Sequence, residues 1–278
     1  MTDDRDRPSH DDAPSEIQYH IDVGPTDVAD TVLLPGNPER VDTVLECWDT
    51  GDLVGEHREY RTATGSYEGT PLSVTSTGIG SPSAAIAVEE LARIGAETFI
   101  RVGSCGALHP DLSIGDLVIT TGAVRQEGTS DEYVRGDYPA VADYTVVSAL
   151  AAAAERLGYP YRTGVTMSAD SFYAGQGRPG YGGFEAAGSA ELLSNLRAAN
   201  VTNIEMETSV ILTLASLYGL RAGAVCTVFA DRDTGEFATE GEAKAVETAS
   251  LAAHLLARMD DRVRTADAHS WHAELCLE

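Results

Sequence analysis

Apolar residues fall into two kinds of segment that alternate along the chain from about residue 31 onwards. Nearly continuous apolar runs, such as 31–36 and 98–104, predict strands that are covered on both faces. Segments with helical periodicity, such as 83–94 and 143–157, predict helices. The segment 60–69 alternates and turns as a β-hairpin would. The same reasoning predicts further strands at about 72–78, 115–124, 161–168, 201–206 and 221–229, and further helices at about 37–47, 208–218 and 239–263.

This alternation predicts an α/β fold, namely a single-domain three-layer α/β/α sandwich with a central mixed, twisted sheet. Residues 1–15 are polar and acidic and are expected to form a flexible tail. Residues 16–265 are expected to form the domain, and 266–278 a C-terminal tail. A chain of 278 residues with 43% hydrophobic content can bury one sizeable core, which argues against wholesale disorder.

The charge balance is strongly acidic, with 44 Asp and Glu residues against 19 Lys and Arg and a formal net charge of -25. Such a surface repels polyanions, so neither a nucleic acid nor an anionic membrane is expected as a partner. Lys244 is the only lysine. An acidic, nearly lysine-free composition that keeps its arginines favours a salt-adapted, haloarchaeal-type cell, because concentrated salt screens a dense acidic surface. An ordinary acidic protein is the simpler interpretation of the same composition.

The sequence shows no feature of export. The first fifteen residues lack the basic and apolar regions of a signal peptide, and no apolar stretch approaches the ~18 residues that cross a bilayer. The four cysteines are far apart and form no C-x-x-C pair. We therefore expect a cytoplasmic protein with reduced thiols. His269, His272 and Cys276 lack a fourth ligand, so no metal centre is predicted there.

Three strand-to-loop junctions combine glycines with arginines or hydroxyls: 36–40, 78–83 and 101–106. Free backbone amides at a helix start, together with a guanidinium, form a site for an oxyanion. A plain turn would explain any one of these junctions. An arginine at the end of an apolar strand, however, needs an anionic or carbonyl partner, so Arg101 favours an anion site. Arg40, one turn into the helix after 31–36, favours the same kind of site at that helix start. The chain has no G-K-[ST] or G-x-G-x-x-G motif at a suitable place, which makes ATP-driven and NAD-dependent chemistry poor hypotheses.

Two further segments carry groups that suit a nucleoside. Glu205 and Glu207 lie one residue apart at a strand end, where both point to one face and can accept vicinal hydroxyls or stabilise a developing positive charge. A helix start, where acidic residues are favoured, would explain the same pair more simply. The loop that contains Phe172, Gln176 and Arg178 combines an aromatic ring, an amide and a guanidinium, which is typical of a nucleobase pocket but also fits a plain loop.

Taken together, these segments resemble the nucleoside phosphorylase family, and within it most closely the uridine phosphorylase branch. The resemblance extends over about residues 19–260. Its motifs, in chain order, are PGNPER (35–40), HREY (57–60), VTSTGIGSPSAAIAVEEL (74–91), FIRVGSCGA (99–107), SFYAGQGR (171–178) and NIEMET (203–208). Several independent motifs in the right order make the resemblance specific, whereas any one alone would be weak.

The resemblance implies a set of roles for residues at matching positions. The phosphate site consists of Gly36, Arg40, Arg101 and Ser104, with Arg58 supplied by a neighbouring subunit. The ribose site consists of Glu205, Met206 and Glu207, with His20 supplied by the neighbour. The base pocket consists of Cys105, Gly106, Phe172, Gln176 and Arg178. Arg40, Arg101 and Glu207 are the candidate catalytic residues among them.

The resemblance also implies an assembly and its small-molecule partners. The family forms dimers that usually assemble into hexamers, so we expect a homo-oligomer. Inorganic phosphate and a nucleoside are the substrates, and no cofactor is expected. Glu59, Ile79 and Ser83 match an intersubunit site for a monovalent cation, so a structural potassium ion is conceivable.

The function implied is reversible phosphorolysis of uridine to uracil and ribose 1-phosphate through an oxocarbenium-like transition state. One segment, GSCGA (103–107), instead resembles the purine branch, which has an aspartic acid near the end of the late strand. That position is Ala230 here, and Asp231 follows, so a purine phosphorylase with Asp231 as the acid needs a local β-bulge. A nucleosidase of the same fold, or a nucleoside-binding module without turnover, would use only part of this set of residues.

Overall fold

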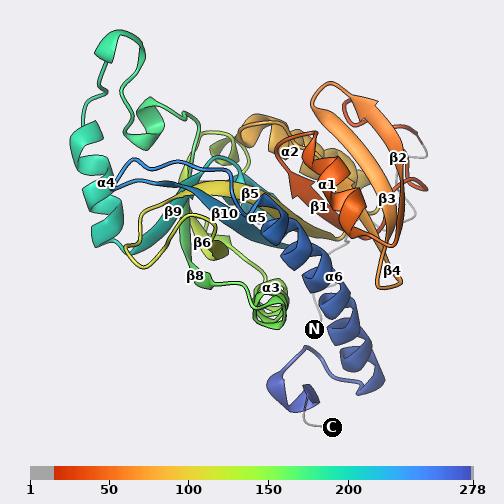
Figure 1. The fold of residues 1–278 in the computed structure, drawn as a ribbon. Coiled ribbons are helices and arrows are strands. Elements are labelled where there is room, and N and C mark those ends of the chain that lie inside the picture. Colours follow the sequence, from red (N-terminus) through yellow and green to blue (C-terminus); the bar gives the residue numbers. More distant parts are fainter. Residues whose placement is uncertain (1–15, 277–278) are drawn as a thin grey trace, which may run out of the picture.

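The computed structural model describes residues 16–276, which form a ten-stranded mixed sheet with helices on both faces (Figure 1). The predicted tail at 1–15 lies outside the described residues. The strands are β1 Thr31–Pro35, β2 Thr50–His57, β3 Tyr60–Tyr67, β4 Thr70–Thr75, β5 Thr98–Ala107, β6 Leu117–Gln126, β7 Ala140–Val141, β8 Tyr161–Ala169, β9 Val201–Glu205 and β10 Arg221–Asp231. The helices are α1 Arg40–Cys47, α2 Ser81–Arg93, α3 Tyr144–Leu157, α4 Ser189–Ala198, α5 Thr208–Tyr218 and α6 Glu242–Thr265.

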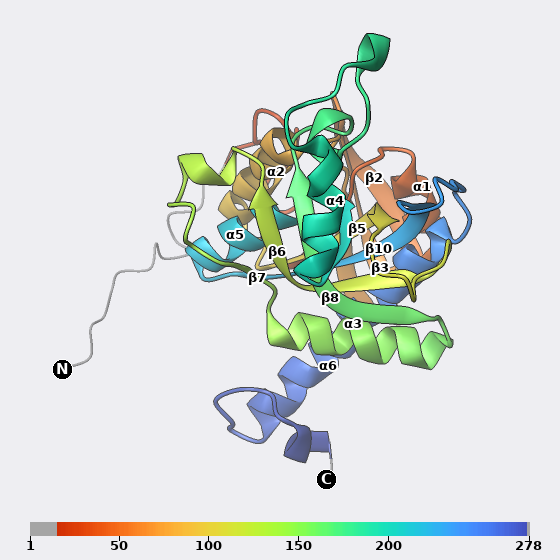
Figure 2. The ribbon, with the colours of Figure 1, turned by 90° about the vertical axis from the view of Figure 1, so that its left-hand side faces the viewer.

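The sheet confirms the predicted fold class, with two groups of helices separated by the strands (Figures 1 and 2). Helices α1, α3 and α6 pack on one face, and α2 and α5 pack on the other. Alternate residues of the central strands serve the two layers: Leu33 and Ile100 belong to the first core, and Val32, Leu34 and Phe99 to the second. This alternation explains why the strands read as continuous apolar runs, since neither face meets water.

The long strand β5 connects two parts of the sheet. It pairs in parallel with β1 through residues 98–102 and antiparallel with β9 at Gly106 and Ala107. Strand β10 runs parallel to β5 and also pairs with β6, which pairs with β8, and β8 with β9. These five strands therefore form a closed ring towards the carboxyl end of β5, and the segments that follow β1, β4, β8, β9 and β10 meet there.

Three elements were not predicted, because none of them carries a strong apolar pattern. β2 is exposed along most of its length at the sheet edge, and α4 has no buried residue. β7 contains only two residues. The residues just after α6 contact the body, since the Tyr144 hydroxyl donates to the Trp271 carbonyl at 2.9 Å and Arg262 donates to the Leu275 carbonyl at 2.6 Å. Within residues 16–276, no helix combines the length and apolarity needed to span a bilayer.

Candidate active site

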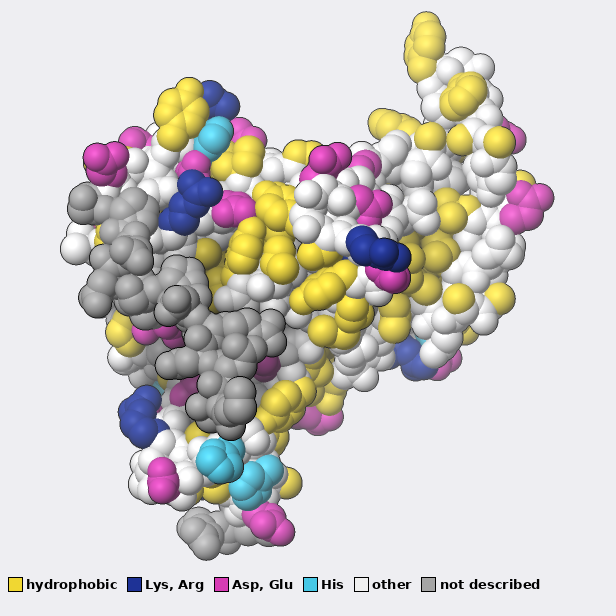
Figure 3. All heavy atoms as spheres, turned by 180° about the vertical axis from the view of Figure 1, so that it is seen from behind, with side chains coloured by type: hydrophobic (Ala, Val, Ile, Leu, Met, Phe, Trp, Pro, Cys, Tyr) yellow, Lys and Arg dark blue, Asp and Glu magenta, His cyan; other side chains and the backbone are white. Residues whose placement is uncertain are grey.

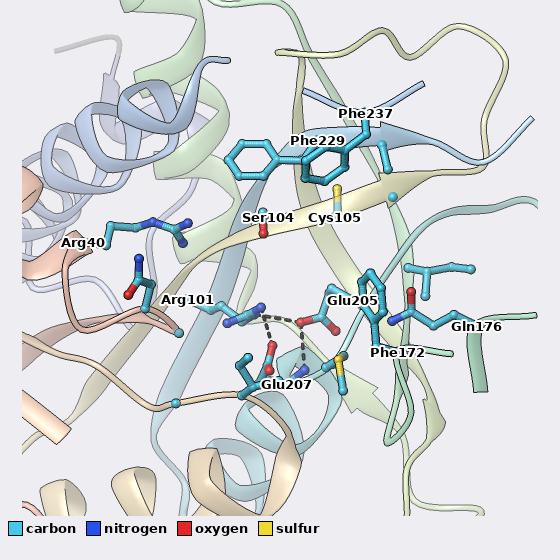
Figure 4. A pocket seen from close by; sticks show the side chains of 18 of the residues that line it. Arg40, Arg101, Ser104, Cys105, Phe172, Gln176, Glu205, Glu207, Phe229 and Phe237 are labelled. Carbon is cyan, nitrogen blue, oxygen red and sulfur yellow. Dashed lines mark hydrogen bonds and ion pairs between the residues drawn. The ribbon is translucent and has the colours of Figure 1, made fainter. Parts of the chain in front are cut away.

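A cavity of about 540 Å³ opens where the ends of β1, β5, β9 and β10 meet (Figure 4). It brings together most of the residues that the sequence singled out for phosphate, ribose and base. These residues are Gly36, Arg40, Arg101, Ser104, Cys105, Gly106, Phe172, Gln176, Arg178, Glu205, Met206 and Glu207. Ile79, named for a cation site, also lines the cavity. They come from separate segments of the chain, so their assembly depends on the sheet topology.

Arg101 is the most buried cation of the cavity, with 4% of its side chain exposed. Its Nε donates to Glu205 Oε2 at 2.8 Å, and its Nη2 forms an ion pair with Glu207 Oε2 (Figure 4). Burial alone would lower the pKa of Arg101, but the two carboxylates raise it well above its usual value, so this residue is a permanent cation. Its buried Nη1 has no hydrogen-bond partner among the described residues. A buried donor without a partner is costly, and an anion in the cavity would satisfy it.

Arg40 lies on the same side of the cavity as Arg101 and Ser104 (Figure 4). It belongs to the first turn of α1 and is only 7% exposed. Its Nη1 donates to the Val102 carbonyl at 2.9 Å, and its Nε donates to Glu242 Oε1 at 2.7 Å. Because a guanidinium has five N–H donors, these contacts fix its plane and still leave donors for a ligand.

Glu205 and Glu207 differ in what surrounds them. The two oxygens of Glu205 accept hydrogen bonds from the Ser168 hydroxyl, Arg101 and the backbone amides of Glu207 and Thr208. Burial raises the pKa of Glu205, but Arg101 and the other donors together outweigh burial, so the net pKa lies below its ordinary value. The oxygens of Glu205 are thus occupied by donors from the protein, and these contacts hold Arg101 and the start of α5 in place.

Glu207 accepts from the Gly80 amide at 2.5 Å and pairs with Arg101. Burial raises its pKa above the ordinary value, and Arg101 offsets only part of that effect. Ser81 Oγ donates to the backbone carbonyl of Met206 at 3.0 Å and so ties this corner to the start of α2. Glu207 therefore has fewer protein donors around its carboxylate than Glu205 has.

The opposite end of the cavity is formed by the loop after β8. Gln176 is buried, and its Oε1 accepts from Arg178 Nη1 at 2.5 Å. The Arg178 guanidinium lies 4.1 Å from the centre of the Phe172 ring. Burial and the nearby Arg232 lower the pKa of Arg178 to about 10. The pair presents an amide and a planar cation beside an aromatic ring, as the sequence predicted for a base pocket.

Phe229 and Phe237 line the cavity but were not predicted, and neither was Arg232, which contacts the lining residue Gln176. Phe229 and Phe237 form an aromatic wall over Cys105 (Figure 4). Arg232 donates from Nη2 to the Gln176 carbonyl at 2.7 Å, and its buried Nε has no partner among residues 16–276. The sequence shows an apolar run that contains Phe229 and the arginine that follows it. The directions in which these side chains point depend on a register shift between Val228 and Ala230, which no local sequence pattern indicates.

The register shift does not bring Asp231 into the cavity. Ala230 lines the cavity instead, and the Asp231 carboxylate accepts from the backbone amides of Asp233 at 2.7 Å and Thr234 at 3.1 Å. These hydrogen bonds lower the pKa of Asp231 below its ordinary value. A general acid needs a proton and a path to the substrate, and Asp231 has neither in this conformation.

The remaining predicted residues lie outside the cavity or at its rim. His20 Nδ1 lies 2.5 Å from Glu90 Oε1, and Arg58 lies over the Tyr19 ring at 5.7 Å from its centre. Glu59 and Ser83 lie beside Gly78, and Ser83 Oγ donates to the Gly80 carbonyl at 3.1 Å. Ile79 is 80% exposed at the cavity rim. Of these predicted residues, only Ile79 lines the cavity.

Comparison with known proteins gives a consistent set of similarities. Residues 30–263 match the family described as the phosphorylase superfamily. The chain is 56% identical to a uridine phosphorylase of Thermococcus kodakarensis over 256 residues, which is 92% of each chain. It is 44% identical to a guanosine phosphorylase of Halorubrum lacusprofundi over 211 residues, or 76% of this chain and 82% of that one. It is 37% identical to the uridine phosphorylase of Escherichia coli over 233 residues, or 83% of this chain and 92% of that one.

Proposed function

This chain belongs to the phosphorylase superfamily, and from that membership we propose that it cleaves uridine with inorganic phosphate to give uracil and ribose 1-phosphate. One observation carries the proposal: the buried Arg101, with an unpartnered Nη1, lies in the same cavity as the Gln176–Arg178 pair. A hydrolase needs no such cation, since its nucleophile is water. A simple binding module needs no anion site at all.

The phosphate occupies the end of the cavity formed by Gly36, Arg40, Arg101 and Ser104. The two guanidinium groups offset its negative charge, and the Ser104 hydroxyl donates a hydrogen bond to it. Together they hold the phosphate beneath the anomeric carbon of the ribose. Gly36 lets the loop after β1 pack closely against the segment around Gly78, because a Cβ at this position would lie 3.1 Å from the Gly78 carbonyl. The reaction then needs no activated water, because a phosphate oxygen is the nucleophile.

Glu207 contributes to bond cleavage through the sugar. As the glycosidic bond breaks, positive charge develops on the ribose ring, and a carboxylate at the vicinal hydroxyls is attracted more strongly to the transition state than to the substrate. Arg101 keeps Glu207 in place through its ion pair. Glu205 positions the guanidinium of Arg101, whose Nε donates to Glu205 Oε2 at 2.8 Å, and so positions Glu207 indirectly.

The chemistry of the leaving base favours uridine over guanosine as the substrate. Gln176 and Arg178 can hydrogen-bond the carbonyl oxygens of uracil and stabilise its anion without a proton donor. A purine leaves more easily when its imidazole nitrogen is protonated, and Asp231 is turned into its own loop with a lowered pKa. The similarity to a guanosine phosphorylase keeps that activity as the second candidate.

The active assembly in this proposal is a homo-oligomer, dimer-based and hexameric. Arg58 and His20 reach the cavity of a neighbour, since neither lines its own. Exposed apolar side chains gather across the face opposite to that of Figure 1 (Figure 3), and Val141, Leu217 and Tyr218, near the ends of α5 and β7, are exposed as well. The proposal further includes a cytoplasmic location, adaptation to high salt, and a potassium ion at Glu59, Ile79 and Ser83.

The test is the release of free base from uridine, thymidine, inosine and guanosine, with and without phosphate, in multimolar KCl. Uracil release that depends on phosphate supports the proposal. Hypoxanthine or guanine release that depends on phosphate overturns the uridine assignment and retains the phosphorylase. Base release that proceeds equally without phosphate identifies a hydrolase and overturns the proposed reaction.

A further inference from the structure

Glu242 supplies the main counter-ion of Arg40, although it comes from the opposite end of the chain and was not singled out by the sequence. It stands in the first turn of α6, and its Oε1 accepts from Arg40 Nε at 2.7 Å and lies 2.5 Å from Nη2. Its side chain is 38% exposed, whereas that of Arg40 is 7% exposed. Glu242 itself is not among the residues that line the cavity.

The fold holds this carboxylate in place. Just before α6, the Gly241 carbonyl accepts from Thr227 Oγ1 at 3.1 Å. Two residues after Glu242, Lys244 Nζ donates to the Gly115 carbonyl at 2.9 Å. The first turn of α6 is therefore attached to β10 and to the loop before β6, and these contacts keep the backbone of Glu242 within reach of Arg40.

The charges around the proposed phosphate position are unusual for an anion site. Arg40 and Arg101 provide two cations, but Glu205, Glu207 and Glu242 provide three carboxylates in direct contact with them. Glu205 and Glu207 also organise Arg101 and the ribose. Glu242 has no such second role in the cavity, and its Oε1 occupies the edge of the Arg40 guanidinium formed by Nε and Nη2, which is one of the two edges that can bind two phosphate oxygens.

We propose that Glu242 is a positioning residue that competes with phosphate for Arg40 and thereby weakens phosphate binding. This proposal rests on the proposed phosphorolysis. Within that reaction, Glu242 determines how tightly the enzyme binds phosphate. A resident carboxylate keeps Arg40 in one orientation when phosphate is absent. It also limits how tightly phosphate and the phosphorylated sugar are held, which favours release of the product in each turnover.

The experiment compares Glu242→Gln, Glu242→Asp and Glu240→Gln in the full chain. Glutamine keeps the shape and a hydrogen-bond acceptor for Arg40 but removes the charge, whereas aspartate keeps the charge. Glu240, two residues away and exposed, provides a control with the same change of net charge. The readouts are the dissociation constant of inorganic phosphate by calorimetry and the separate KM values for phosphate and nucleoside.

We expect Glu242→Gln to lower the phosphate dissociation constant and KM by about threefold to tenfold, since removing one charge near the protein surface changes the interaction by about 1 kcal/mol. The KM of the nucleoside should stay the same, because a general disturbance of the fold would change both. Glu242→Asp and Glu240→Gln should remain near the wild type. An unchanged or raised phosphate KM in Glu242→Gln overturns the proposal, and so does an equal decrease in Glu242→Asp or Glu240→Gln.

Failure of this inference is distinguishable from failure of the proposed function. If the wild-type protein neither binds phosphate nor needs it for cleavage, the phosphorolytic reaction itself is wrong. If the wild type needs phosphate and Glu242→Gln behaves as the wild type does, only the role of Glu242 is wrong.

Discussion

Replacing Arg101 with alanine is expected to weaken the fold and abolish phosphate-dependent cleavage at the same time. Arg101 is 4% exposed and contacts the side chains of both Glu205 and Glu207, which are 1% and 5% exposed. Without the guanidinium, two adjacent carboxylates stay buried with no cation. Breaking a buried ion pair in this way costs about 3–5 kcal/mol. Since ordinary domains have a stability of about 5–15 kcal/mol, the variant should lose a large share of its free energy of unfolding.

The assay is urea unfolding of wild type and variant at fixed protein concentration, at several pH values. Loss of Arg101 raises the pKa of both glutamates, and a neutral carboxyl group needs no cation. The deficit in free energy of unfolding should therefore be largest at neutral pH and shrink as the pH falls and the two groups bind protons. The triple variant Arg101→Met, Glu205→Gln, Glu207→Gln removes all three charges and should regain most of the lost stability.

Two results would contradict this reasoning. The first is a free energy of unfolding for Arg101→Ala that lies within about 1 kcal/mol of the wild-type value at neutral pH. An unpaired buried charge should cost much more, so this result would mean that Arg101 does not stabilise the buried carboxylates. If Arg101→Ala retains phosphate-dependent release of uracil at the wild-type rate, Arg101 does not bind the phosphate. The first result concerns the packing of the site, and the second concerns its chemistry.

Three further predictions concern single side chains of the site. Arg178→Leu should raise the KM of uridine about 10–100-fold and leave that of phosphate unchanged, since it removes a charge-assisted hydrogen bond to the base; steady-state kinetics with each substrate varied in turn measures this. Because burial and Arg232 lower the pKa of Arg178 to about 10, the uridine KM of the wild type should rise more steeply than that of Arg178→Leu as the pH increases through that value; the loss of the proton on N3 of uracil contributes equally to both. Ser168→Ala should lower the free energy of unfolding by about 1–3 kcal/mol, because Glu205 loses a buried donor, and Ser168→Thr should retain most of the stability; equal stability of all three proteins in urea unfolding would contradict the contact. Asp231→Asn should leave base release unchanged, because the carboxylate only accepts from the amides of Asp233 and Thr234; a large loss of activity would mean that Asp231 reaches the substrate.

The sequence by itself determined the fold class, most of the elements and most of the cavity. Strands such as β1 and β5 are buried on both faces, so their apolar content identifies them without any tertiary information. Arg40 and Glu207 were predicted because each stands where a strand gives way to a helix, and such places are where ligands bind in sheets of this kind. Arg101 was predicted at a strand end, but β5 continues past it to Ala107. The elements that the sequence missed, β2 and α4, have little buried surface and hence little apolar pattern.

Only the tertiary structure decided which partners these residues have. The pairing of Arg101 with Glu205 joins residues 104 positions apart, and that of Arg40 with Glu242 joins residues 202 positions apart. No local period records such contacts, because they depend on β1, β5, β9 and β10 meeting at one end of the sheet. The same holds for the shift at Phe229, after which Ala230 lines the cavity and the Asp231 side chain is held by backbone amides of the following loop. Local sequence fixes which groups stand at strand ends, but their charge balance and their direction depend on packing between segments that are distant in the chain.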